Sequence, residues 1–358
     1  MMCKKCVLSS TTPGVKLDQE GICNQCNTHT DFIHTGEDKL LKILESAKSV
    51  QGKYDCIVNV SGGRDSSYTL LKLAKDYKMK VLAVNYENPF TDPQARLNIQ
   101  NAVDTLDVDI VRFKLKDQIH EKTFKNNFLT WSKKPSPALI PMVCIACKTM
   151  WYEIIKIAKK NNVHLIVDGG NHYEFTSFKN ELLNIKWDNK YETIFIKALL
   201  SVLRETIKNP AYYHPSYLST MVKGYLFADQ FAIGSRIVSP GITRIQLFQY
   251  IPWDEHEVLS RITSELNWDY PRRLGTTWRF DCKVDHLKNF LYTKTIGTTE
   301  KEDFYSRLIR ENKITREEAL ERLKIENKIQ WDDIKSLMEQ VGIPGDQAQM
   351  QLENIKFP

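Results

Sequence analysis

The residues with the clearest chemical potential form one short run, Ser61-Gly62-Gly63-Arg64-Asp65-Ser66-Ser67. The apolar segment 55–60 before it predicts a short buried strand, and leucines at helical spacing after Ser66 predict a helix. The two glycines permit positive φ angles and let a ligand approach the backbone closely. Strand, turn and helix together present backbone N–H groups and a positive dipole end to an anion. The run therefore predicts a phosphate-binding loop, although it matches neither the Walker A nor the G-x-G-x-x-G pattern.

Other polar residues follow further predicted strands. We expect strands at 55–60, 81–86, 109–113 and 165–168, separated by helical segments. This alternation predicts a parallel sheet with right-handed crossovers, whose ligand lies outside the carboxyl ends of the strands. The loop, the end of the second strand at Asn85 and Tyr86, and the pair Asp168-Gly169 all fall on that edge. Asn85 and Tyr86 could equally be ordinary strand ends.

Three charged residues at this edge suit phosphate chemistry. Mg²⁺ prefers one or two carboxylates together with phosphate oxygens, so Asp65 and Asp168 are the expected carboxylates for it. Asp168 could instead cap a helix. Arg64 is the expected charge partner of a transferring phosphoryl group. We therefore assign catalysis to Arg64 and Asp65.

Four of the eight cysteines form two C-x-x-C pairs near the N-terminus, at Cys3, Cys6, Cys23 and Cys26. Thiolates at this spacing can close a tetrahedral zinc site. Because the ligand set is complete, we expect the zinc to be structural. Coincidental cysteines are the less favoured interpretation.

A second group is formed by Cys144, Cys147 and the distant Cys282. Three thiolates with one open position suit a catalytic zinc ion or a [4Fe–4S] cluster. The alternative is a set of reduced structural cysteines, as we expect for Cys56 in the first strand. The metal of this second site stays open.

The composition places the chain among ordinary globular proteins. It has 358 residues, 42% hydrophobic and 26% charged, with a formal net charge of +6. The mild charge suits polyanionic substrates but shows no dense basic cluster, so nucleic-acid binding is not expected. We expect no secretory signal, no run long enough to span a membrane, and a cytoplasmic location.

The loop Ser61–Ser66 closely resembles the SGGxDS loop of the PP-loop ATP pyrophosphatases, which cleave ATP to AMP and pyrophosphate. The resemblance implies an adenine nucleotide alpha hydrolase-like α/β domain at 33–205, after a zinc-knuckle module at 1–32. A mainly helical substrate or partner region follows at 206–358. It also implies that residues after the second strand pack on the adenine. The implied ATP-binding residues are Ser61, Gly62, Gly63, Arg64, Asp65, Ser66, Ser67, Asn85, Tyr86, Asp168 and Gly169.

Over nearly the full length, the chain resembles the bacterial N-acetyl sugar amidotransferases of the WbpG and PseA type. The resemblance rests on the N-terminal cysteine pairs, the loop, Val143–Lys148 and Trp278–His286. It implies that an acetamido group on a nucleotide sugar becomes an acetamidino group, for surface-polysaccharide or flagellin glycan biosynthesis. ATP would adenylate the amide oxygen and ammonia would then displace AMP. Because the chain contains no Gly-x-Cys-x-Gly elbow, a separate glutaminase is expected to supply the ammonia.

Two alternatives remain open. The sulfur-inserting PP-loop tRNA enzymes share the loop, the zinc knuckles and a C-x-x-C plus single cysteine that holds a cluster. Those relatives usually carry Lys where this chain has Arg64, and they need a basic RNA-binding face. A non-catalytic nucleotide-binding partner of a glutaminase is the other alternative.

Overall fold

The computed structural model describes residues 1–48, 52–185, 191–227 and 232–355. Its centre is a five-stranded sheet in the order β3-β2-β1-β4-β5, with all neighbouring strands parallel. The strands are β1 (Cys56–Asn59), β2 (Val81–Tyr86), β3 (Asp109–Phe113), β4 (Leu165–Asp168) and β5 (Thr243–Gln246). The prediction of an α/β protein with a parallel sheet is confirmed, and the four expected strands are all present.

The fifth strand was not expected, because the sequence predicted a mainly helical region at 206–358. β5 lies at the sheet edge and pairs with β4 alone, so only Ile245 among its residues is fully buried. A four-residue edge strand with one buried apolar residue leaves little hydrophobic pattern in the sequence. The segment 206–358 therefore contributes a strand to the sheet. The proposed domain boundaries stay predictions.

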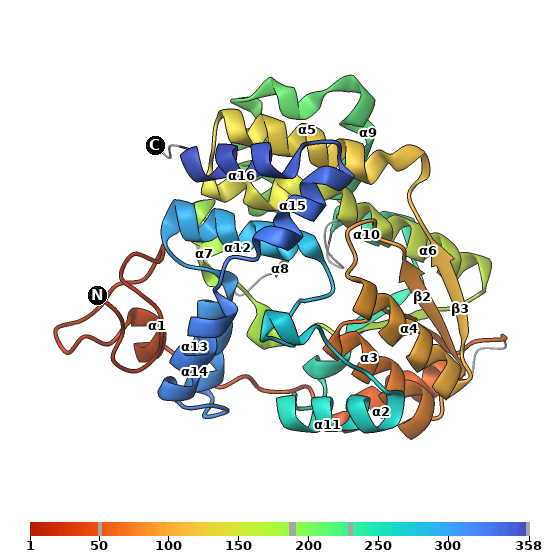
Figure 1. Ribbon diagram of the computed structural model, residues 1–358. Helices are drawn as coiled ribbons and strands as arrows, with labels where there is room; N and C mark the ends of the chain where they lie inside the picture. Colours follow the sequence, from red (N-terminus) through yellow and green to blue (C-terminus); the bar gives the residue numbers. More distant parts are fainter. Residues whose placement is uncertain (49–51, 186–190, 228–231, 356–358) are drawn as a thin grey trace.

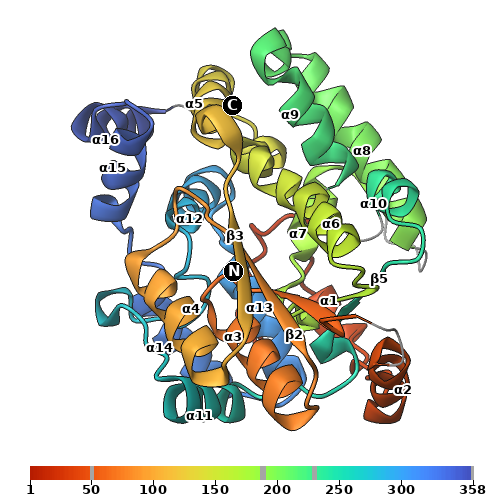
Figure 2. The same cartoon turned by 90° about the vertical axis from the view of Figure 1, so that its right-hand side faces the viewer.

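Helices cover both faces of the sheet (Figures 1 and 2). Alternate strand residues point to opposite faces: Val58 and Ala83 pack in the core with α3 and α4, and Ile57 and Leu82 pack with α6. The α-helices of the first half are α1 (Asn24–Asn27), α2 (Glu37–Lys48), α3 (Arg64–Leu71), α4 (Pro93–Leu106), α5 (Ile119–Lys133), α6 (Met150–Lys160) and α7 (Ser177–Leu182).

The second half of the chain is mainly helical, as predicted. Its α-helices are α8 (Tyr191–Ile207), α9 (Pro215–Leu226), α10 (Ile233–Val238), α11 (Glu255–Leu266), α12 (Lys283–Ile296), α13 (Glu300–Arg310), α14 (Arg316–Glu326), α15 (Trp331–Gln340) and α16 (Gly345–Asn354). Shorter helical turns are η1 (Lys72–Asp76), η2 (Lys116–Gln118), η3 (Pro137–Thr149), η4 (His172–Glu174), η5 (Pro210–Tyr213), η6 (Leu247–Gln249) and η7 (Arg272–Leu274). A second hydrophobic core joins α5, η3, α9, α12, α15 and α16.

One helical stretch corrects the sequence-based expectation about membrane spans. Pro137–Lys160, which joins η3 and α6, is long and apolar enough to cross a membrane. Of its most apolar window, 56% is buried inside the protein. Core helices of this kind pass the same length and composition test.

The N-terminal segment that carries the first cysteine quartet packs on α13 and α14. Val7 N–H donates to the Ser306 hydroxyl at 3.3 Å, and Arg316 Nε donates to the Cys6 carbonyl at 3.0 Å. The module is thus attached to the C-terminal helices, at the side of the molecule where Figure 1 marks the N-terminus.

The predicted phosphate-binding loop, residues 61–67, follows β1 at the point where the strand order reverses, with β2 on one side of β1 and β4 on the other. In open parallel sheets this switch point leaves a crevice outside the strand ends. Gly62 makes the turn with a φ of +80°, and a Cβ there would lie 2.0 Å from the Ala95 carbonyl oxygen on α4. Asn98 Nδ2 and Trp268 Nε1 both donate to the Gly62 carbonyl, at 3.1 and 3.0 Å.

We predict that Gly62→Ala lowers the free energy of unfolding by about 2 kcal/mol or more, because it combines a positive φ with a backbone clash. Gly241→Ala is the matched control: its φ is +84°, but a Cβ there meets nothing within 4 Å. This control should lower the free energy of unfolding only by the backbone strain of the positive φ, about 1 kcal/mol. Urea unfolding measures both, and equal losses in the two variants would contradict the close approach to α4.

Candidate active site

Hydrogen bonds within the loop hold it in a compact turn between β1 and α3. The Ser61 N–H donates to Ser66 Oγ at 3.2 Å, and the Gly63 N–H donates to Ser61 Oγ at 3.3 Å. Ser66 Oγ in turn donates to the Gly63 carbonyl at 3.2 Å. The two serine side chains of the motif therefore stabilise the turn.

The helix that follows the loop begins without a side-chain cap. Gly63 is the N-cap of α3, and no side chain of the described residues caps it. The first N–H groups of a helix have no partner within the helix and carry the positive end of its dipole. The N-terminus of α3 is therefore available to an anion at the switch point of the sheet.

The carboxylate of Asp65 is fixed by three donors from separate parts of the chain. Its Oδ1 accepts from Arg64 Nε at 2.9 Å and from Trp253 Nε1 at 3.0 Å. Its Oδ2 accepts from Asn171 Nδ2 at 2.8 Å. These bonds occupy three of the roughly four acceptor positions of the carboxylate, so the geometry gives Asp65 a positioning role in the loop.

Arg64 lies inside the protein, with only 3% of its surface exposed. Its NH1 donates to Glu255 Oε1 at 2.7 Å, and its guanidinium lies over the Trp253 ring at 4.7 Å. Burial lowers the pKa of Arg64, but the Asp65 and Glu255 carboxylates outweigh it and raise the pKa overall. The predicted contact of Arg64 with a phosphoryl group would require these partners to be released.

Asp168 lies at the end of β4 and is paired with Arg244 of β5, whose Nε donates to Asp168 Oδ2 at 2.7 Å. The next residue, Gly169, packs against the start of α3: a Cβ there would lie 2.6 Å from the Asp65 carbonyl oxygen. The structure thus places Gly169 beside the loop, as predicted. Asp168 makes an ion pair, which neither the metal-ligand nor the helix-cap interpretation anticipated.

The two residues expected near the adenine both point into the protein. Asn85 Nδ2 donates to the Val60 carbonyl at 2.8 Å, which ties the end of β2 to the start of the loop. The Tyr86 hydroxyl forms a hydrogen bond of 2.6 Å with His120 Nδ1. Both side chains are buried. Their geometry matches the strand-end interpretation.

The thiols of the second cysteine group lie near one another, since Cys147 and Cys282 both affect the pKa of Cys144. His120 Nε2 lies 3.0 Å from Cys144 Sγ, and Asn88 Nδ2 donates to Cys282 Sγ at 3.4 Å. Burial raises the pKa of Cys144, and the nearby Cys147 and Cys282 raise it further. Burial also lowers the pKa of His120 to about 3, so its imidazole is neutral.

These three thiols do not form a site for a single metal ion as they stand. Among the described residues, only Cys3, Cys6, Cys23 and Cys26 bring three or more such ligand atoms within 4.8 Å of one another. A polynuclear cluster holds its thiolates further apart than one ion does. The trio's metal therefore stays a prediction.

The N-terminal quartet is a metal-binding cysteine cluster. Cys6 Sγ and Cys23 Sγ lie 3.7 Å apart, and all four thiols are buried. The N–H groups of Lys5 and Cys23 donate to Cys3 Sγ at 3.4 and 3.2 Å. Hydrogen bonds with Cys26 and Cys6 lower the pKa of Cys23, while the hydrogen bond with Cys23 raises the pKa of Cys26. The set fits one tetrahedral ion.

Sequence reasoning missed Asp281, whose carboxylate faces the loop. A Cβ on Gly63 would lie 3.3 Å from Asp281 Cγ. Burial raises the pKa of Asp281 to about 6, and the Ser61 hydroxyl opposes the shift. Asp281 precedes Cys282, so one short segment brings a carboxylate to the loop and a thiol to the trio. The sequence signal that could have indicated Asp281 is its position next to Cys282, which had already been singled out.

Trp253, Asn171, Glu255 and His120 were also missed. Asn171 and Trp253 are 106 and 188 residues from Asp65 in sequence, and Glu255 is 191 residues from Arg64. Contacts at such separation leave no periodicity or motif in one sequence. Asn171 alone lies close after a pair that had been singled out, Asp168-Gly169.

No family model matches the chain. It is similar to an uncharacterised protein from Methanocaldococcus jannaschii, with 32% identity over 116 residues, which is 31% of this chain and 42% of that protein. The chain thus matches less than half the length of this curated relative.

Solved structures similar to the chain include NMN synthetase from Francisella tularensis, at 13% identity and a TM-score of 0.38, covering 81% of this chain and 91% of the other. A second is the U34-tRNA thiolase NcsA from Methanococcus maripaludis with its [4Fe-4S] cluster, at 15% identity and a TM-score of 0.36, covering 92% of this chain and 91% of the other. A third is the NH3-dependent NAD synthetase from Campylobacter jejuni, at 14% identity and a TM-score of 0.30, covering 54% of this chain and 94% of the other. At these TM-scores the likeness supports no argument about function.

We predict that Cys26→Ser removes bound metal and destabilises the N-terminal module, because three thiolates cannot close the tetrahedral site. Metal analysis and thermal unfolding measure the two effects. Cys56→Ala, which removes a core thiol outside the quartet, should keep the metal content. A Cys26→Ser protein with full stability that loses only activity would contradict the structural role.

We also predict that Arg64→Gln lowers the free energy of unfolding by about 3 kcal/mol, since it leaves the Asp65 and Glu255 carboxylates without their cation. Arg261→Gln is the control, because Arg261 bridges Asp76 and Glu265 nearer the surface. This substitution should lower the free energy of unfolding by about 1 kcal/mol or less. Urea unfolding compares the two. If Arg64→Gln were fully stable but inactive, Arg64 would act on the substrate instead.

Proposed function

We propose that the protein is a PP-loop enzyme that uses ATP, releases AMP and forms a C–N bond on an N-acetyl sugar. In this proposal it adenylates the acetamido oxygen and substitutes ammonia, giving an acetamidino sugar for surface-polysaccharide or flagellin glycan biosynthesis. We place this reaction in the cytoplasm. The choice of an N-acetyl sugar as the acceptor rests on the sequence resemblance alone. The use of ATP is also supported by the geometry of the loop.

The observation that carries the proposal is the uncapped N-terminus of α3 at the switch point of the sheet. The loop before it is held by its own serines, and Gly62 permits the tight turn against α4. N–H groups fixed in this way can bind phosphate oxygens without reorganising when charge develops on them. This is the arrangement that adenylation needs.

In this proposal each residue around the loop has a separate role. The loop N–H groups bind the phosphates, while Arg64 and Asp65 hold the loop in place from inside. Mg²⁺ bound with ATP would neutralise phosphate charge. Asp281 is the carboxylate that faces the loop and it replaces Asp65 as the first candidate to hold the ion, since the oxygens of Asp65 are already bonded.

Ammonia has to arrive separately. We propose a class I glutaminase subunit as its source and a nucleotide-linked N-acetyl sugar as the acceptor. Attack of ammonia on the adenylated carbon forms the C–N bond, and AMP leaves with the former amide oxygen. Two protons are lost from the attacking nitrogen on the way to the neutral amidine.

One observation favours the alternative of tRNA thiolation. Cys144, Cys147 and Cys282 lie near one another, and Cys282 is next to Asp281, which faces the loop. Three thiols near an adenylation site could supply the ligands of a cluster that delivers sulfur. The two functions differ in acceptor, so one assay separates them.

We predict that AMP and pyrophosphate form when the protein, purified without oxygen, is given Mg-ATP, a high concentration of ammonium salt and an acetamido nucleotide sugar. Ser61→Ala should reduce the rate at least about tenfold, because it removes a hydrogen bond that shapes the loop. The control Ser132→Ala, at an exposed hydroxyl on α5, should leave the rate of AMP formation unchanged.

Parallel reactions contain unmodified tRNA in place of the sugar. AMP that appears only with tRNA would replace the sugar reaction by thiolation. A Ser61→Ala protein that still forms the product at the normal rate would instead support the non-catalytic partner of a glutaminase.

A further inference from the structure

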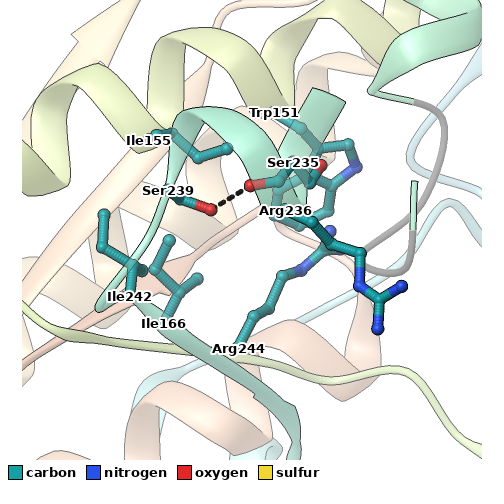
Figure 3. Close-up of a pocket in the computed structure, with 8 residues that line it drawn as sticks. All are labelled: Trp151, Ile155, Ile166, Ser235, Arg236, Ser239, Ile242 and Arg244. Carbon is teal, nitrogen blue, oxygen red and sulfur yellow. Dashed lines mark hydrogen bonds between the residues drawn. The ribbon is translucent and has the colours of Figure 1, made fainter. Parts of the chain in front are cut away.

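Two hollows in the described part of the molecule lie away from the loop, and they differ in charge. The cavity in Figure 3 has a volume of about 140 Å³ and lies between α6, α10 and β5. Its Arg244 is paired with Asp168 and its Arg236 also has a partner, so neither arginine is free. The second hollow is a groove of about 450 Å³ where the N-terminal cysteine module meets the turn between α13 and α14 (Figure 1).

The groove has positive charge that no carboxylate of its lining cancels. Three of its lining residues are basic, Lys5, Lys313 and Arg316, and one is acidic, Glu318. Among the described residues, none of these three cations forms an ion pair with a carboxylate. Glu318 is itself paired with Arg322, at 2.6 Å. Even with Glu318 counted in full, three basic residues against one acidic residue leave an excess of two positive charges.

Arg316 is held at the edge of the groove by the cysteine module. Its Nε donates to the Cys6 carbonyl at 3.0 Å, and its NH2 donates to the Cys3 carbonyl at 3.2 Å. Carbonyl oxygens carry no net charge, so these bonds orient the guanidinium without neutralising it. Its NH1 has no hydrogen-bond partner among the described residues and can donate to an anion.

The remaining lining indicates the kind of ligand that fits. Ile309 and Ile314 supply apolar wall, and clefts with one sign of charge and apolar walls concentrate ions of the opposite sign. The volume lies within the range of about 300–1,000 Å³ that small-molecule sites have. None of the lining residues is aromatic, so the groove lacks the stacking surface that single-stranded nucleic acids use. These features favour a small anion.

We propose that the groove binds a small dianion, a phosphate group or a dicarboxylate, between Lys5, Lys313 and Arg316. The two charges of such a ligand match the excess of the lining. The site is separate from the loop and does not depend on the proposed function.

The position of the groove gives the bound anion a structural consequence. Lys5 lies between the first two cysteines of the quartet, whereas Lys313 and Arg316 belong to the turn and the start of α14. An anion that contacts all three therefore joins the cysteine module to the C-terminal helices. A ligand that binds only this folded arrangement raises the stability of the protein.

The test is a calorimetric titration of the full-length protein with inorganic phosphate and, in a second arm, with succinate. Chloride keeps the ionic strength constant, and the metal content is measured before and after each titration. A saturating non-hydrolysable ATP analogue with Mg²⁺ occupies the loop. The midpoint of thermal unfolding is measured on the same samples.

We expect saturable binding in at least one arm, weakened about tenfold or more in the double variant Lys5→Gln/Lys313→Gln. Both lysines are exposed, so this variant should fold normally, whereas Arg316→Gln would also loosen the cysteine module. The matched control is Lys159→Gln, at an exposed lysine on α6, which should bind as wild type does.

The anion should also raise the unfolding midpoint of wild type and of Lys159→Gln, but not that of the double variant. Binding of phosphate alone would identify a phosphate site, and binding of succinate alone a dicarboxylate site. Absence of saturable binding in both arms, or equal binding to wild type and to the folded double variant, would overturn the proposal.

Discussion

The carboxylate of Asp65 is the interaction on which the geometry of the candidate site depends. A buried carboxylate is stable only when its oxygens are hydrogen-bonded or paired with charge. Asp65 meets that need with Arg64 in the loop, Asn171 after β4 and Trp253 before α11. One side chain therefore joins three segments, and the loop reaches its final shape only when the second half of the chain has folded against it.

Because these charges are satisfied internally, the loop offers a ligand its backbone and little else. Arg64 is buried between Asp65, Glu255 and the Trp253 ring. The motif thus has two parts: charged side chains that hold the turn, and N–H groups at the start of α3 that no side chain of the described residues caps. Preorganised dipoles of this kind stabilise developing charge without moving. Arg64 and Asp65 contact other side chains of the protein in this structure, and their assignment to catalysis stays a prediction.

What the sequence predicted well is local. β1, β2 and β4 are short, mainly apolar and bounded by polar turns, so their positions follow from hydrophobic pattern. β3, which carries Asp109 and Arg112 and has no buried residue, shows this pattern more weakly. The quartet at Cys3–Cys26 follows from spacing, because each pair lies within one turn of the chain. β5 was missed because it has one buried apolar residue, and the partners of Arg64 and Asp65 were missed because they lie up to 191 residues away. The assignment of Arg64 and Asp65 to a ligand stays a prediction, and the structure adds that side chains from a distant segment bond both of them.

That distant segment runs from Trp253 to Cys282, between β5 and α12. Trp253 bonds Asp65, Trp268 bonds the Gly62 carbonyl, Asp281 faces Gly63, and Cys282 completes the trio. The quartet can close by itself, whereas the trio exists only when this segment is in place. Its thiols are kept protonated by burial, so a metal would have to displace their protons on binding. Loop and trio are therefore positioned by the same residues, which makes the two sites one cooperative unit of the fold.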